Sequence, residues 1–435
     1  MFIPNFFVSN RSAVRFPRLS RLAAAGILFL FALLSVAARA GELSFFGETE
    51  KDPLAYAPGE EIVFNVRLFE DGAPCAGKTV RWLRTGDDGK TESGEAVTSA
   101  DEPLTIRTAI DTPGFVWLKV VALDEAGNNV PGENHEFNGG AGVLLDRLGS
   151  APEPDDFDAF WARQKERLAE VPLKAHLREV ESPNDAVACY DLRVDCLGAP
   201  VSGYFCLPVG AKEKSLPALL VLQGYGVASA SKEIRAGKTQ LALCINAHGI
   251  ENGRDADFYQ NLFNTTLKSY GFPAESNADP ETSYWNGVAM RVMRALEFLK
   301  SRPEWDGKNI TVTGGSQGGF QSILGAALDE QVSACHLNVP WFCDVSGTAL
   351  QSRNPSFFRP EWTDALGYYD GVNHAKRIKC PVTISAGLGD YVCPPSGVMT
   401  LYNNLGVPAT LEFIQGNTHG YSMKDAPKYR LEKNR

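Results

Sequence analysis

Residues 310–328 read ITVTGGSQGGFQSILGAAL, and this stretch decides the fold that we expect. An alternating strand-like run leads into Gly-Gly-Ser-Gln-Gly-Gly, and small and apolar residues then follow at helical spacing. Gly314, Ser316 and Gly318 match the pattern G-x-S-x-G, which places a serine on a strained turn between a strand and a helix. A side chain two residues to either side of the serine would collide with the neighbouring strand and helix. The stretch therefore predicts a nucleophilic Ser316 above the C-terminal edge of a sheet.

Strand-like and helical segments alternate on both sides of this motif. Continuous apolar runs, typical of parallel strands buried on both faces, occur at 216–226, 240–249, 309–315, 380–390 and 409–416. A helical pattern between the second and third runs carries an apolar stripe, Val288, Val292, Leu296 and Leu299. A second helical pattern, FDAFWARQKERL, begins at residue 157, with Asp155 or Asp156 placed to cap it. The alternation predicts a doubly wound, mostly parallel α/β domain over residues 155–430.

A serine hydroxyl needs a base to become a nucleophile. In this type of sheet the partners follow in the order serine, acid, histidine, and His336, His374 and His419 are the histidines after Ser316. His336 lies in a predicted strand, which favours a packed side chain, and His374 lies near a helix end. His419 lies in a Gly/Asn/Thr loop directly after the last predicted strand. His419 is therefore the first candidate for the base, with His374 second and His336 third.

Asp390 is the candidate for the acid that orients the histidine. It follows a predicted strand through two glycines, although an ordinary turn aspartate would fit the same position. Backbone N–H groups of Gln317 and Tyr225 are the candidate donors to the oxyanion, with Gly224 expected to let the chain approach closely. This chemistry requires no metal and no organic cofactor.

The first forty residues have the layout of a secretory signal peptide. Four arginines precede an apolar run at 22–38, and the triplet Ala38-Arg39-Ala40 follows. Cleavage after Ala40 predicts an exported protein, periplasmic or secreted, with no stable membrane span; a retained membrane anchor is the alternative. Cleavage removes five arginines and no acidic residue, so the net charge changes from −10 to −15. This charge argues against nucleic acid and anionic lipid as partners and favours neutral substrates such as polysaccharide fragments.

Residues 42–148 have the pattern of a small all-β domain. Period-two apolar positions separated by Gly, Asp and Pro turns include Phe64, Val66, Leu68, Val116, Leu118 and Val120. The pattern predicts an immunoglobulin-like sandwich. We expect Trp82 and Trp117 in its core, and stacking on sugars is the alternative. The nine cysteines form no C-x-x-C pair, which makes a zinc or redox centre a weak interpretation, and no disulfide can be assigned.

Residues 155–430 resemble the acetyl xylan esterase / cephalosporin-C deacetylase family, carbohydrate esterase family seven. The shared motifs are FDAFWARQ, Gly224-Tyr225, GGSQGG, GLGDYVCPPSGVMTLYNNL and THG. By position, the resemblance places the triad on Ser316, Asp390 and His419 and the oxyanion hole on Tyr225 and Gln317. It implies an α/β-hydrolase fold and a serine carboxylic ester hydrolase that removes acetyl groups from acetylated sugars, such as xylan or xylo-oligosaccharides, through an acyl-enzyme.

The chain departs from the family pattern at the pocket. Gln223 replaces the histidine of the usual His-Gly-Tyr, Asn-Ala-His-Gly at 246–249 replaces Arg-Gly-Gln-Gly, and the helix before the serine strand lacks the usual aspartate. The added sandwich and the export signal argue against the hexameric ring of the compact cytoplasmic members, and a homo-oligomer is left open. Two alternative functions are another hydrolase on the same triad, either a peptidase or a non-carbohydrate esterase, and a carbohydrate-binding protein with an inactive α/β domain.

Overall fold

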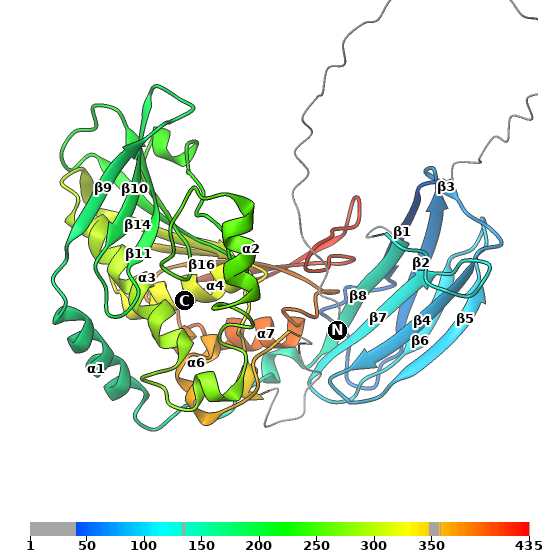
Figure 1. The fold of residues 1–435 in the computed structure, drawn as a ribbon. Helices are drawn as coiled ribbons and strands as arrows, with labels where there is room; N and C mark the ends of the chain where they lie inside the picture. The colour runs from blue at the N-terminus through cyan, green and yellow to red at the C-terminus, as the bar shows by residue number, and fades with distance from the viewer. Residues whose placement is uncertain (1–40, 133–134, 348–355, 357, 435) are drawn as a thin grey trace, which may run out of the picture. The chain divides into compact units, whose positions relative to one another are not determined.

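Three sheets organise the described part of the chain, which comprises residues 41–132, 135–347, 356 and 358–434 of a computed structural model (Figure 1). The predicted signal peptide, residues 1–40, lies outside the described residues. Glu42–Arg435 pack as one unit. No helix within the described ranges is long and apolar enough to cross a bilayer.

Two four-stranded antiparallel sheets form the predicted sandwich. One has the order β1-β2-β3 with β6 on β2, and the other has the order β5-β4-β7-β8. Their strands are β1 (Leu43–Thr49), β2 (Ile62–Glu70), β3 (Ala73–Pro74), β4 (Thr79–Gly86), β5 (Glu92–Val97), β6 (Leu104–Thr108), β7 (Gly114–Ala122) and β8 (Glu136–Val143). All six apolar positions named above are buried in the shared core, as the alternation predicts. Trp82 borders this core, whereas Trp117 faces out of it.

The third sheet has ten strands in the order β18-β17-β16-β15-β14-β12-β13-β11-β10-β9. Neighbours from β13 to β17 are parallel, and β9, β10, β11 and β18 are joined by antiparallel pairing. The strands are β9 (Ala175–Val180), β10 (Val187–Val194), β11 (Val201–Pro208), β12 (Leu216–Leu222), β13 (Leu241–Ile245), β14 (Trp305–Gly315), β15 (Ala334–Asn338), β16 (Val382–Gly387), β17 (Ala409–Ile414) and β18 (Lys428–Lys433). The five apolar runs became β12, β13, β14, β16 and β17, so the expected α/β class is confirmed.

The described helices are α1 (Phe157–Ala169), α2 (Ala256–Asn264), α3 (Tyr284–Ser301), α4 (Gln317–Leu328), α6 (Gly371–Ala375) and α7 (Pro395–Asn404). Helices α3, α4 and α7 contact strands of the large sheet, and α1 packs on α3. The predicted stripes of α1 and α3 are buried throughout. Asp156 occupies the N-cap position of α1, but its carboxylate pairs with Arg163 and Tyr368 instead of capping the helix. Helices α3 and α4 also pack on each other, which fixes the helix that follows Ser316.

Candidate active site

Ser316 lies on a strained turn where β14 ends and α4 begins. Its backbone angles are φ 55° and ψ −122°, a region that residues other than glycine seldom adopt. Two backbone hydrogen bonds hold the turn: the Ser316 N–H donates to the Asn338 carbonyl at 3.0 Å, and the Trp341 N–H donates to the Ser316 carbonyl at 3.1 Å. The backbone bonds to Asn338 and Trp341 therefore hold Ser316 in this conformation.

The glycines of the motif are required by close backbone contacts. A Cβ atom on Gly314 would lie 2.5 Å from the Gly318 carbonyl, and one on Gly318 would lie 2.0 Å from the Leu222 oxygen. This confirms the steric reason for glycine two residues to either side of the serine. The corresponding expectation for Gly224 is wrong, because a Cβ there would meet the Gly315 oxygen at an ordinary 3.5 Å. Gly318, and not Gly224, lets α4 approach β12.

A chain of two hydrogen bonds joins Ser316, His419 and Asp390. The His419 Nε2 lies 2.9 Å from the Ser316 Oγ, and its Nδ1 lies 2.9 Å from the Asp390 Oδ2. Asp390 is fully buried, and its Oδ1 accepts the backbone N–H groups of Val392 and Cys393, each at 2.9 Å. Ser316 and His419 remain partly exposed, so a substrate can reach them. The structure thus brings the three residues selected from the sequence into one hydrogen-bonded row.

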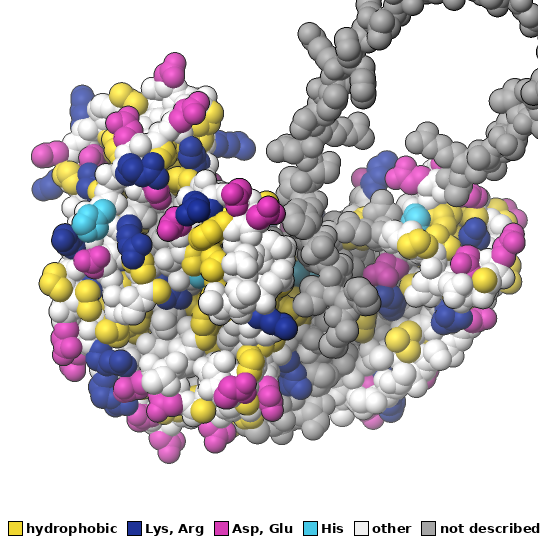
Figure 2. Space-filling view, viewed as in Figure 1, with side chains coloured by type: hydrophobic (Ala, Val, Ile, Leu, Met, Phe, Trp, Pro, Cys, Tyr) yellow, Lys and Arg dark blue, Asp and Glu magenta, His cyan; other side chains and the backbone are white. Residues whose placement is uncertain are grey.

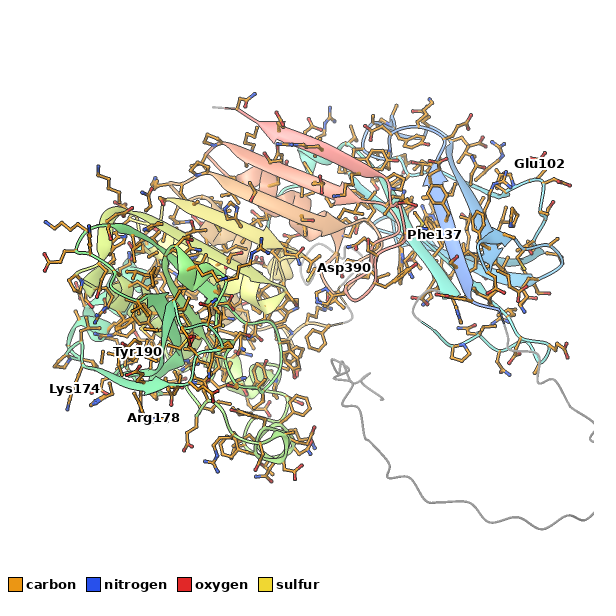
Figure 3. All side chains as sticks on the ribbon, turned by 90° about the horizontal axis from the view of Figure 1, so that it is seen from above. Glu102, Phe137, Lys174, Arg178, Tyr190 and Asp390 are labelled. Carbon is orange, nitrogen blue, oxygen red and sulfur yellow. The ribbon has the colours of Figure 1, made fainter. Side chains whose placement is uncertain are left out.

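Parallel pairing explains why the acid and the histidine meet. Asp390 follows β16 and His419 follows β17, and these neighbouring parallel strands end at the same edge of the sheet. The two loops are also joined directly, since the Gly389 N–H donates to the Asn417 carbonyl at 3.1 Å. The order of strands therefore brings the two side chains side by side. Figure 3 labels Asp390 at this end of the large sheet.

The other two histidines lie outside this row. His336 is on β15 as expected, but its side chain is exposed and contacts Thr383, so the expectation of a packed side chain is wrong. His374 lies near the end of α6 and is fully buried, and its Nε2–H donates to the Tyr368 carbonyl at 3.0 Å. Burial lowers the pKa of His374 to about 3, so this imidazole is neutral.

The two candidate oxyanion donors come from adjacent segments. Gln317 is the first residue of α4, and the first N–H groups of a helix have no partner within it and face the positive end of its dipole. Tyr225 follows β12, whose loop is tied to α4 because the Gln321 side-chain amide donates to the Gln223 carbonyl at 2.8 Å. Both segments border the turn that carries Ser316.

Comparisons with known proteins identify the family of this chain. The model of the family described as acetyl xylan esterase (AXE1) matches residues 144–432. The chain belongs to the acetyl xylan esterase family. It is 31% identical over 297 residues to acetyl esterase Axe7A of Xylanibacter ruminicola, covering 63% of this chain and 67% of that protein.

Solved structures give the same result. An acetyl xylan esterase from Paenibacillus sp. R4 superposes with a TM-score of 0.54 at 26% identity, over 63% of this chain and 93% of that one. Acetyl xylan esterase 1 from Thermoanaerobacterium sp. JW/SL YS485 superposes with a TM-score of 0.52 at 26% identity, over 63% and 92%. The protein is therefore a carboxylic ester hydrolase with an α/β-hydrolase fold, and the alternatives of a peptidase and an inactive binding protein are set aside.

In this acetyl xylan esterase family member, Tyr270 links the two segments that carry the candidate oxyanion donors. Its hydroxyl accepts the Gly226 N–H at 2.9 Å and donates to the Gln317 Oε1 at 3.0 Å. Its ring stacks on Tyr225, with the centroids 4.7 Å apart. Burial raises the pKa of Tyr270, so the hydroxyl keeps the proton that it donates. The sequence analysis missed this residue, because it lies outside every strand and helix and no motif marks it.

His248 bonds the same loop, and its ring contacts that of Tyr270 with the centroids 4.5 Å apart. Its Nε2–H donates to the Gly226 carbonyl at 2.9 Å, so its Nδ1 accepts the hydroxyl of Tyr284. Burial lowers the pKa of His248 to about 4, which keeps the ring neutral. His248, which lies in the stretch that departs from the family pattern, therefore holds the loop of Tyr225 through Gly226.

Asp390, Cys393 and His419 also present ligand atoms within 4.8 Å of one another. A metal would need a thiolate and free lone pairs on the other two residues. Burial raises the pKa of the Cys393 thiol well above its usual value, and the Asp390 Oδ2 is already engaged with the His419 Nδ1. The donor set therefore suits the hydrogen-bonded row better than a metal centre.

Proposed function

We propose that Ser316, His419 and Asp390 are the nucleophile, the base and the orienting acid of this hydrolase, and that it removes acetyl groups from acetylated sugars. The observation that carries the proposal is the row of two 2.9 Å hydrogen bonds from Ser316 through His419 to the buried Asp390. This is the arrangement that serine acyl transfer requires.

The chemistry proceeds through two tetrahedral intermediates. His419 takes the hydroxyl proton as the Ser316 Oγ attacks the acetyl carbonyl, and it then gives this proton to the departing sugar oxygen. Water activated by the same imidazole attacks the acyl-enzyme and releases acetate. Asp390 holds the imidazole with Nδ1 protonated and stabilises the imidazolium. The N–H groups of Gln317 and Tyr225 are the proposed donors to the oxyanion, each worth about 3 kcal/mol of transition-state stabilisation.

Acetylated xylan or xylo-oligosaccharides are the proposed substrates. The relatives named above are acetyl and acetyl xylan esterases. Partly buried aromatic residues, Tyr225, Phe272 and Phe358, contact one another beside the oxyanion loop and offer apolar faces to a sugar ring. The chain carries a net charge of −10, and acidic and basic side chains are interspersed over the face in Figure 2, which suits a neutral ligand better than a polyanion.

Export through residues 1–40 is part of the proposal, because acetylated xylan is a polymer met outside the cell. The support is the run of arginines, the apolar segment and the Ala-Arg-Ala triplet. N-terminal sequencing of the protein recovered from the producing cells tests this step, with Gly41 expected as the first residue.

The test of the substrate is acetate release from acetylated xylan, measured against other acetylated sugars and a simple acetyl ester. We expect xylan and xylo-oligosaccharide esters to give the highest kcat/KM. Equal turnover of peptide amides, or turnover confined to acyl groups that are not on sugars, would contradict the proposal. The Ser316→Ala variant, assayed on the same panel, controls for acetate lost without the enzyme.

A further inference from the structure

We propose that the β-sandwich holds the loops of the catalytic acid and base in place, with Trp117 and the strand β8 as its positioning elements. The proposal rests on the triad proposed above. The sandwich strands concerned are β7 and β8. Residues 388–391, which follow β16, are called the acid loop. Residues 415–423, which follow β17, are called the histidine loop.

An aromatic stack joins the sandwich to the acid loop. The ring of Trp117, on the outer face of β7, stacks on the ring of Tyr391 with centroids 4.1 Å apart and an interplanar angle of 21°. Tyr391 directly follows Asp390 and is 4% exposed. Trp117 is thus placed neither in the sandwich core nor on a free sugar-binding face, and both expectations from the sequence are wrong.

Backbone contacts bring β8 against the same loop. A Cβ atom on Gly389 would lie 2.1 Å from the Asn138 oxygen, and one on Gly140 would lie 2.8 Å from the Leu388 oxygen. Side chains would separate these backbones, so the glycines permit a direct fit. Gly389, the residue before Asp390, therefore packs directly on β8.

The histidine loop contacts the same strand. The side chain of Gln415 is fully buried and bonds Gly140 twice: the Gly140 N–H donates to its Oε1 at 2.9 Å, and its Nε2 donates to the Gly140 carbonyl at 3.0 Å. Further along this loop, the Met423 sulfur accepts the Gly47 N–H of β1 at 3.2 Å. His419 lies between these two attachments.

One strand of the sandwich is therefore attached to both loops. Because Gly140 contacts Leu388 and Gln415, β8 sets the separation of the loops that carry Asp390 and His419. Loss of this fit would let Asp390 shift relative to the imidazole, and a displacement of about 1 Å can reduce a rate about a hundredfold. Substrate binding is not involved, so the effect falls on kcat.

The experiment compares Trp117→Ala with Trp82→Ala in the full-length protein. Trp82 is the matched control because it is in the same sandwich, partly buried, with its ring over Gly94 of β5. Active sites are counted with a fluorophosphonate probe, so kcat and KM for p-nitrophenyl acetate refer to folded, reactive enzyme.

We expect Trp117→Ala to lose between about tenfold and a hundredfold in kcat with an unchanged KM, and Trp82→Ala to keep its kcat. Trp117→Phe, which keeps an aromatic face against Tyr391, restores most of kcat. Loss of stability alone would not change kcat per active site.

A kcat of Trp117→Ala equal to that of Trp82→Ala would overturn the inference. If Trp117→Ala does not fold, Gln415→Met decides, because it removes both hydrogen bonds to Gly140 at similar volume. A Gln415→Met enzyme with unchanged kcat would equally overturn it. Ser316→Ala separates the two proposals: an active Ser316→Ala enzyme rejects the triad, whereas an inactive one beside a fully active Trp117→Ala enzyme rejects the positioning role alone.

Discussion

The hydroxyl of Tyr270 donates a 3.0 Å hydrogen bond to the side chain of Gln317 while it accepts the backbone N–H of Gly226 at 2.9 Å. One side chain thus ties the loop of Tyr225 to the start of α4, the two segments that carry the candidate oxyanion donors. The separation of these two segments therefore depends on the Tyr270 hydroxyl as well as on β12 and β14, the strands that precede them.

Removal of the Tyr270 hydroxyl should therefore reduce turnover without unfolding the protein. We expect Tyr270→Phe to lower kcat for an acetyl ester about tenfold, less than the hundredfold or more that follows loss of an oxyanion donor itself. Tyr259→Phe is the matched control, because that hydroxyl also accepts one backbone N–H, at 3.1 Å from Arg254, and donates to one carbonyl, at 3.0 Å from Glu251. Equal losses of kcat in the two variants would refute a special role for Tyr270.

Replacement of the nucleophile tests the chemistry of the strained turn. Ser316→Ala should lose at least about a thousandfold in kcat while its melting temperature stays close to that of the parent. The hydroxyl of Ser322, on the same helix, donates to the Gly318 carbonyl at 2.8 Å and serves as the control position. Turnover by Ser316→Ala comparable with that of Ser322→Ala would contradict the assignment.

Replacement of Asp390 should lower kcat through its effect on the His419 imidazole and should leave the fold intact. In Asp390→Asn the side-chain oxygen can still accept the N–H groups of Val392 and Cys393, but the amide no longer favours the tautomer with Nδ1 protonated. We expect kcat at neutral pH to fall between about a thousandfold and ten thousandfold. A circular dichroism spectrum and melting temperature like those of the parent would show an intact fold, and a loss of kcat below tenfold would argue against the role.

The free energy of unfolding at acidic pH should depend on His374, a buried histidine outside the candidate site. Burial lowers the pKa of His374 to about 3, whereas in the unfolded chain a histidine titrates near its ordinary value of about 6.5. Between these values the unfolded chain binds more protons than the folded one, so the free energy of unfolding falls as the pH falls. The slope contributed by one such group is at most about 1.4 kcal/mol per pH unit.

His374→Gln keeps a donor to the Tyr368 carbonyl and removes this titration. Urea denaturation at pH 7 and pH 4.5 should show a smaller loss of stability for this variant than for the parent. His336→Gln, at an exposed position, is the control for the removal of a histidine. Parallel stability curves for His374→Gln and the parent would disprove the prediction.

The centre of the sheet could be predicted from the sequence because its parallel strands are continuous apolar runs bounded by glycine. Strands β9 and β18 were not predicted, because their side chains are largely or alternately exposed and give no such signal. Strand β11 was not predicted either, although VSGYFCLP is buried almost throughout and resembles the runs that were recognised. Edge strands are defined here by their partners more than by their own composition.

The candidate triad could be selected because each member directly follows a strand, so local pattern and chain order sufficed. Trp117, Tyr270 and Gln415 could not be selected, because their roles arise from contacts between segments far apart in the chain. Gln415 is four positions before His419, yet only its two bonds to Gly140 distinguish it from any polar residue after a strand.

Fluorophosphonate labelling followed by peptide mapping tests the central claim most directly. The account predicts one label per chain, on Ser316, with esterase activity lost in proportion to labelling. Activity that survives complete labelling of Ser316, or complete inactivation with the label on another residue, would contradict it.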